Sequence, residues 1–233
     1  RHFCLNNFMV KIDKKITNLN SVIDIFQSYY FPVIKDNDLS ENDIKILFLI
    51  SLLGPMNIED DNILKIINKF QIEKDMFMET VKKLNNLELV DYFEGKAVKT
   101  SDQNFSNYIV YKVLIEDKAI TLSELIAKLY PNCILKIISA INMIYEIFYS
   151  SEAEKYIISE IKEIWEKEPY LSDSRFLYHF YNVDRIKAVK MIKKEIDDGE
   201  KKSFDLKKFD FHSKENNQRI DDKKIEILSN FKH

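Results

Sequence analysis

The sequence predicts a mainly α protein with one winged-helix domain, followed by an array of short helix pairs. Three observations predict this class. Apolar side chains recur at steps of three and four residues through most of the chain, as on one face of a helix. The 233 residues include only three glycines and four prolines, too few for the many tight turns of an all-β or α/β protein. Residues 84–103 alone hold two strand-like runs around a turn glycine.

The first segment, residues 1–35, is expected to be helical. Apolar side chains over residues 3–30 fall on one helical face and predict two helices with a break near residues 18–21. The stretch FPVIKDNDL that follows contains a proline and a polar cluster, which should interrupt the helical pattern.

Three helices are expected next. Ser40 begins S-E-N-D, which resembles a capping box with Asp at the third helical position, and an apolar helix then runs to Gly54–Pro55. A second helix is predicted over residues 59–70, with three acidic residues at its start, where the helix dipole favours negative charge. A third is predicted over residues 73–87.

A β-hairpin completes this domain. The runs Leu89–Phe93 and Ala97–Thr100 flank a turn in which Gly95 can take a positive φ without steric cost. Three helices followed by a hairpin give the order of a winged helix. With a further helix over residues 103–117, begun by Asp102 as N-cap, the domain is expected to cover residues 36–118.

Residues 119–233 read as a helical array that is incomplete at its C-terminal end. The sequence contains no strict repeat, but short helices alternate with polar joins, as in an α-solenoid. The helices are predicted over residues 121–130, 132–149, 150–168, 172–182, 183–197 and 221–231.

Charge argues against a nucleic-acid partner. The whole chain has a formal charge of −3, and residues 40–102 contain eight lysines against twelve acidic residues. The third helix contains no arginine, the residue that most often reads guanine edges. Since phosphate neutralisation dominates nucleic-acid affinity, the winged helix is expected to contact protein instead. Asn85 and Asn86, which resemble base-reading amides, are interpreted as the polar end of a helix.

No catalytic or metal-binding residue is predicted. The three glycines lie far apart, so the chain cannot hold the G-x-x-x-x-G-K-[ST] phosphate loop. The four histidines lack zinc-site spacing, and His179 is interpreted as part of an aromatic helix face. The aromatic run over residues 176–181 is interpreted as a helix–helix interface, with base stacking or peptide anchoring as the alternative. Cys4 and Cys133 are expected to be reduced thiols.

A cytoplasmic location is expected, without a membrane partner. No uninterrupted apolar stretch approaches 18 residues, and the N-terminal residues lack the order of a signal peptide. Because the chain begins at Arg1 and not at a methionine, it is expected to be a piece of a longer polypeptide.

Nearly the whole chain resembles the segment that follows the nucleotide-binding core in bacterial STAND NTPases, which are signal-transduction ATPases related to AAA+ proteins. The resemblance lies in the pattern of residue types and in the order of four stretches: LSENDIKILFLISLL, KTSDQNFSNYIVYKVLIEDK, FLYHFYNVDRIKAV and NNQRIDDKKIEILSNF. It implies that residues 1–35 are the helical lid of the ATPase, that residues 36–118 are its winged helix, and that the remainder begins a helical sensor or scaffold.

The family's function is that of a molecular switch. The resemblance implies a non-catalytic regulatory portion that couples nucleotide state to oligomerisation through contacts with its own ATPase core, with sister subunits and with a trigger, in defence against phage. ATP or ADP with Mg²⁺ would bind the full-length protein, whose P-loop would lie upstream of residue 1. Arg1 falls where the family's sensor-2 arginine approaches the phosphates.

Two alternatives from other functional classes stay open. One is a winged-helix transcriptional regulator that binds DNA. The other is a stand-alone helical adaptor protein.

Overall fold

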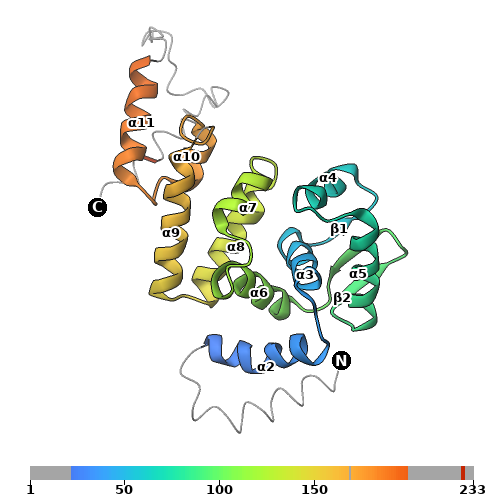
Figure 1. The fold of residues 1–233 in the computed structure, drawn as a ribbon. Coiled ribbons are helices and arrows are strands. Elements are labelled where there is room, and N and C mark those ends of the chain that lie inside the picture. The colour runs from blue at the N-terminus through green and yellow to red at the C-terminus, as the bar shows by residue number, and fades with distance from the viewer. Residues whose placement is uncertain (1–21, 168, 199–226, 229–233) are drawn as a thin grey trace, which may run out of the picture. The chain divides into compact units, whose positions relative to one another are not determined.

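The computed structural model describes residues 22–167, 169–198 and 227–228. Over these residues the chain is mainly helical with one small antiparallel sheet, which confirms the predicted fold class (Figure 1). The chain forms two compact units that divide between Glu160 and Ile161, inside helix α9 (Ser151–Trp165). The predicted borders at residues 35 and 118 both lie within the first unit.

The first unit contains a winged helix. Its three strands are hydrogen-bonded in the order β1-β3-β2, so that the last strand along the chain lies in the middle of the sheet. This strand order, together with three preceding helical segments, is the arrangement of a winged helix. In chain order the elements are α3 (Glu41–Leu53), β1 (Met56–Asn57), α4 (Asp61–Lys69), α5 (Lys74–Asn86), β2 (Val90–Phe93) and β3 (Ala97–Thr100).

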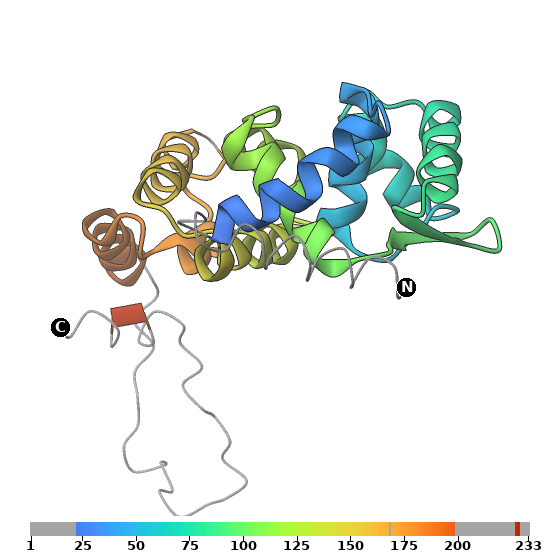
Figure 2. The same cartoon turned by 90° about the horizontal axis from the view of Figure 1, so that it is seen from below.

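The β2–β3 hairpin is the wing, and it projects from the three helices (Figure 2). Lys96 N–H donates to the Phe93 carbonyl at 2.8 Å and closes the turn. Glu94 has φ 48° and Gly95 has φ 74°, and two successive positive φ values are typical of the type I′ turns that suit a twisted hairpin. The prediction of a positive φ at Gly95 is confirmed.

Strand β1 was absent from the sequence-based prediction. It pairs with β3 through Met56 opposite Val98 and Asn57 opposite Ala97. Two residues are too few to show the alternation that identifies a strand. The third strand of the sheet is therefore a product of tertiary pairing.

Helix α3 is the centre of the first unit. Every residue from Ile46 to Ile50 is 0% exposed, because α5, β3, α6, η2 and α8 all contact this helix. A helix that is apolar all round needs such neighbours on every side. The helices that follow the sheet in this unit begin with α6 (Gln103–Tyr111), η2 (Lys112–Glu116), α7 (Leu122–Leu129) and α8 (Ile134–Ile147).

The predicted helix over residues 103–117 changes character at Lys112, where η2 is a π-helical turn. Asp117 N–H donates to the Lys112 carbonyl at 2.8 Å, five residues back. The buried Lys112 ammonium lies 3.1 Å from Asp117 and 3.6 Å from Glu116. These two carboxylates compensate the charge of a lysine that would otherwise be costly to bury.

Helix α2 (Val22–Asp36) continues through Pro32, so the prediction that this proline interrupts the helix was wrong. Proline has no N–H, so the Ser28 carbonyl loses its usual donor, and the cost in a helix interior is about 3 kcal/mol. Packing of α2 on the rest of the unit compensates for this loss. The predicted helix before residue 18 and the break at residues 18–21 lie outside the described residues.

Aromatic rings attach α2 to the unit. Phe26 meets Phe148 edge to face with ring centroids 4.9 Å apart, and Tyr30 lies 5.2 Å from Phe105 and 5.7 Å from Tyr108. The Tyr30 hydroxyl also donates to Asp102 at 3.1 Å, the residue that caps α6. In Figure 2, α2 runs beside the helices that follow the sheet.

The second unit is built around Trp165 at the end of α9. Its indole packs on Phe176 of α10 (Ser174–Phe180), with ring centroids 5.9 Å apart. Ala188 and Ile192 of α11 (Arg185–Asp198) are also buried. Lys187 lies 5.1 Å from the centre of the Trp165 ring and binds Glu166 at 2.7 Å. Of the helix predicted over residues 221–231, only residues 227–228 are described, and they are helical.

We predict that Phe148→Ala lowers the free energy of unfolding of the first unit by about 3–5 kcal/mol. Phe148 is fully buried between Phe26 and Tyr111, so truncation leaves a cavity and loses both ring contacts. Urea unfolding followed by circular dichroism measures the change. Tyr149→Ala is the matched control, because Tyr149 is 60% exposed and its truncation should cost about 1 kcal/mol or less. Equal midpoints for the two variants would contradict the assigned packing.

Candidate interaction surface of the winged helix

The surface formed by α5 and the wing is the one that a DNA-binding winged helix would use, and we call it the α5–wing face. It contains Phe93, which is 50% exposed. Its exposed charged residues without an ion-pair partner in the structure are three lysines and three carboxylates: Lys74, Lys82, Lys96, Asp75, Glu79 and Glu94. The α5–wing face is therefore neutral and of mixed sign.

Two further lysines of this region are held in ion pairs. Lys83 Nζ lies 2.6 Å from Asp43 Oδ2, and Lys99 Nζ lies 3.5 Å from Asp91 Oδ2 across the wing. Lys99 also lies 5.7 Å from the centre of the Phe93 ring. Binding a phosphate with either ammonium would compete with an existing carboxylate.

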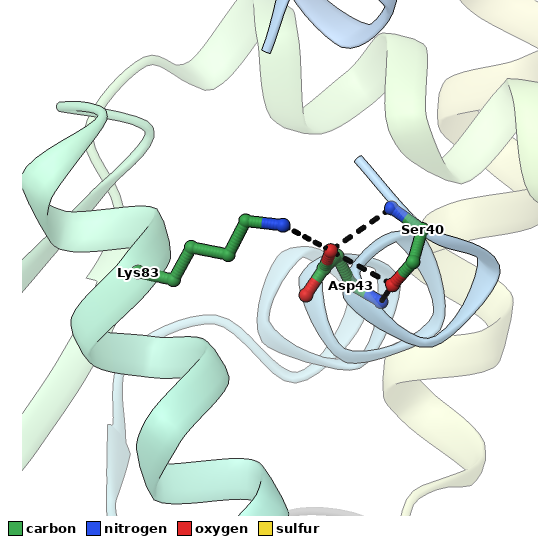
Figure 3. Close-up of polar contacts among 3 residues, drawn as sticks. All are labelled: Ser40, Asp43 and Lys83. Carbon is green, nitrogen blue, oxygen red and sulfur yellow. Dashed lines mark hydrogen bonds and ion pairs between the residues drawn. The ribbon is translucent and has the colours of Figure 1, made fainter. Parts of the chain in front are cut away.

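Asp43 connects two helices of the winged helix (Figure 3). Its Oδ2 accepts Ser40 N–H at 2.9 Å, while Ser40 Oγ accepts Asp43 N–H at 3.2 Å. The predicted capping box is thereby confirmed, with Asp in the place of the usual Glu or Gln. Lys83 completes this cluster from α5, 40 residues away, and no sequence pattern indicated this contact.

The environment of Asp43 acts on its pKa in opposite directions. Burial raises the pKa of this carboxyl, but the hydrogen bonds from Lys83 and Ser40 outweigh burial and lower the pKa below its ordinary value. Asp43 is consequently a carboxylate at neutral pH, although its side chain is only 8% exposed.

Asn85, at the end of α5, has a structural role. Its side-chain Oδ1 accepts the Tyr92 N–H at 3.0 Å and so connects α5 to strand β2. This supports the interpretation of the asparagine pair as a helix end. Asn86 is exposed beside it.

Nucleic-acid affinity requires lysines and arginines that outnumber the carboxylates on one face. The six unpaired exposed charges of the α5–wing face cancel, and Lys83 is bound to the buried Asp43 carboxylate. The exposed Phe93 is of the aromatic type that protein interfaces enrich.

The other residues considered as site candidates from the sequence lie in different parts of the chain. Arg1 lies outside the described residues. Phe176 and Phe180 are buried in the second unit, as the helix–helix interpretation expected, while His179 on the same helix is exposed. Cys133 is a free thiol, and burial raises its pKa, with Lys69 and Lys136 acting in the opposite direction.

A groove of about 580 Å³ lies between the first turn of α3, the end of η2 and the start of α7. Its apolar lining includes Ile44, Val113 and Ile120. Two of its carboxylates are already paired, Asp117 with Lys112 and Glu124 with Lys128 at 2.6 Å. Sequence reasoning missed this groove because its walls are about 70 residues apart in the chain.

Within the described ranges, no three His, Cys, Asp or Glu side chains are placed to hold a metal ion. Within the same ranges, no helix has the length and apolar composition needed to cross a bilayer.

Comparisons with protein-family models, with curated proteins and with solved structures found no match to this chain.

We predict that Asp43→Asn lowers the free energy of unfolding by about 1–3 kcal/mol at pH 7, because the amide loses the ion pair and weakens the cap. The folded pKa of Asp43 is lowered, so its contribution is complete above the unfolded value of about 4 and is lost as pH falls through the lower folded value. The gap between wild type and variant should therefore shrink in acid. Urea titrations at several pH values measure it.

We further predict that Lys83→Met is destabilising by about 1–2 kcal/mol, since it leaves the buried Asp43 carboxylate without its cation. Lys82→Met is the matched control. Lys82 is the adjacent exposed lysine of α5 and has no ion pair in the structure, so its replacement should change stability by about 0.5 kcal/mol or less. Thermal melts of both variants make the comparison, and equal losses would refute the role of the pair.

Proposed function

We propose that this chain is a non-catalytic regulatory portion of a STAND-type ATPase and that its winged helix contacts protein. The observation that carries the proposal is the neutral α5–wing face, on which three lysines are matched by three carboxylates. Such a face lacks the electrostatic attraction on which DNA-binding winged helices depend. The sequence resemblance described above supplies the ATPase context.

The order of elements supports this proposal. A helix, α2, precedes the winged helix, and further short helices follow it, which is the order that the resemblance implies for lid, winged helix and helical array. Aromatic contacts attach α2 to Phe105 of α6 and to Phe148, which follows the last residue of α8, and let α2 and the winged helix act as one body. Such a body is suited to docking on an ATPase core and separating from it when the nucleotide changes.

In this proposal nucleotide chemistry belongs to residues upstream of Arg1, which would bind ATP or ADP with Mg²⁺. The partners of the present chain are its own ATPase core, sister subunits and a protein trigger. Defence against phage in the cytoplasm is the process that the resemblance supports.

We predict no saturable binding of a fluorescent DNA duplex to the chain at low salt, measured by anisotropy. The double variant Asp75→Lys, Glu79→Lys is the matched positive control. It makes the α5–wing face net positive and should create binding that weakens steeply with added salt. Saturable, salt-dependent binding by the unmodified chain would favour the transcriptional-regulator alternative and refute a purely protein-binding winged helix.

The ATPase context has a separate test. We expect the gene upstream of Arg1 to encode the phosphate-loop pattern G-x-x-x-x-G-K-[ST], following a predicted strand and opening a helix. Sequencing of the upstream region decides this. An upstream region of several hundred codons without that pattern would overturn the ATPase assignment and leave the protein-binding role of the α5–wing face untouched.

A further inference from the structure

Helix α11 carries an apolar surface on its outward side. Ile186 is 71% exposed, Val189 is 41% exposed and Ile196 is 54% exposed. These residues are three and seven positions apart, so they fall on one side of the helix, and we call this side the α11 outer face. Single exposed aliphatic residues are common, but these three lie along one side of a helix and form an apolar stripe, with Lys193 between Val189 and Ile196.

The buried side of α11 adjoins the α11 outer face, because Ile192 is three residues after Val189 and four before Ile196. Ala188 is 0% exposed and Ile192 is 1% exposed. The apolar surface of α11 is therefore wide, extending from the buried Ala188 and Ile192 to the exposed Ile186, and a helix with so wide an apolar surface normally packs against more than one neighbour. Ile227, near the C-terminal end, is buried while Ile186 stays exposed, so the packing of Ile227 does not cover the α11 outer face.

Positive charge surrounds the stripe. Arg185, Lys190 and Lys193 are exposed and have no ion-pair partner among the residues that the structure describes. A surface hollow of about 480 Å³ lies against Arg185, Ile186, Val189 and Lys190. Lys187 differs from these residues, because Glu166 neutralises it. The one exposed carboxylate on this side that the structure describes is Asp197, in the last turn.

We infer that the α11 outer face binds an amphipathic helix of another protein, whose apolar stripe is flanked by carboxylates. The aliphatic residues of α11 would pack on the partner's stripe, and Arg185, Lys190 and Lys193 would meet its acidic flanks. The stripe from Ile186 to Ile196 is about 15 Å long at 1.5 Å per residue, so about three turns of the partner cover it.

Charge argues against a second copy of this chain as the occupant. A symmetric dimer would place the same face against itself, so that the basic residues around the stripe would meet their own copies. The composition also argues against a membrane surface, since the exposed apolar residues of the face are aliphatic and include no aromatic anchor. The inference does not depend on the ATPase assignment, because it rests on the second unit alone.

The probe for the test is a fluorescent synthetic helical peptide, with leucines at positions i, i+3 and i+7 and glutamates flanking them. Its matched control has lysines in place of the glutamates. We expect the complete chain to bind the acidic peptide saturably in an anisotropy titration and to leave the basic peptide unbound. Ile186→Ser and the double variant Lys190→Glu, Lys193→Glu should each weaken binding by about tenfold or more.

Lys162→Glu is the control variant of the protein, because Lys162 is an exposed lysine of the same unit on α9. It should bind the acidic peptide like wild type, and thermal melts should show that all variants are folded, since every substituted residue is exposed. Absence of peptide binding, or equal binding by wild type and Ile186→Ser, would overturn the inference. So would binding to phosphatidylserine vesicles, or self-association in light scattering, that is lost in Ile186→Ser while the peptide fails to bind.

Discussion

The complete burial of the middle of helix α3 is the constraint on which the first unit depends. Five consecutive residues, Ile46–Ile50, have no exposed surface, so the helix is stable only while its neighbours surround it. Those neighbours include the third helix and central strand of the winged helix on one hand, and α6 and α8 on the other. The winged helix and the helices after it consequently share one core. Packing therefore continues across the domain boundary that the sequence predicted at residue 118.

Ion pairing decides what the surface around this core offers to other molecules. Lys83 is used to hold Asp43 at the start of α3, and Lys99 is matched to Asp91 within the wing. The remaining charges of the α5–wing face are three of each sign. In the second unit, by contrast, Lys187 is neutralised by Glu166 while its neighbours on the outward side of α11 are not. The two units therefore present surfaces of different electrostatic character.

Features that depend on residues close together in the chain were predictable from the sequence. The capping box joins Ser40 to Asp43 three residues later, and the wing turn needs only Gly95 and its neighbours. Helix existence followed from apolar periodicity in the same way, and the observed ends differ from the predicted ones by a few residues. The burial of Phe176 and Phe180 likewise followed from their spacing on one helix face.

Features that depend on distant residues were not predictable. Strand β1 exists because Met56 pairs with Val98, and α2 passes through Pro32 because Phe26 packs on a ring more than 100 residues later. The partner of Asp43 and the groove beside α3 come from segments that only the fold brings together. The α11 outer face was not predictable because its lysines are interleaved with acidic residues in the sequence. Only the helical structure places the lysines apart from most of these acidic residues.

The π-helical turn at Lys112–Glu116 also sets the direction of the helices that follow it in the first unit. Its hydrogen bond spans five residues where an α-helix spans four, so it contains in effect one inserted residue. One residue corresponds to a rotation of roughly 100° about a helix axis. Deleting a single residue there would restore an ordinary helix with nearly the same composition. The chain would then leave this helix in a direction rotated about the helix axis, and the following helices would no longer pack on α3. The length of this short segment, more than the identity of its residues, therefore orients the rest of the first unit.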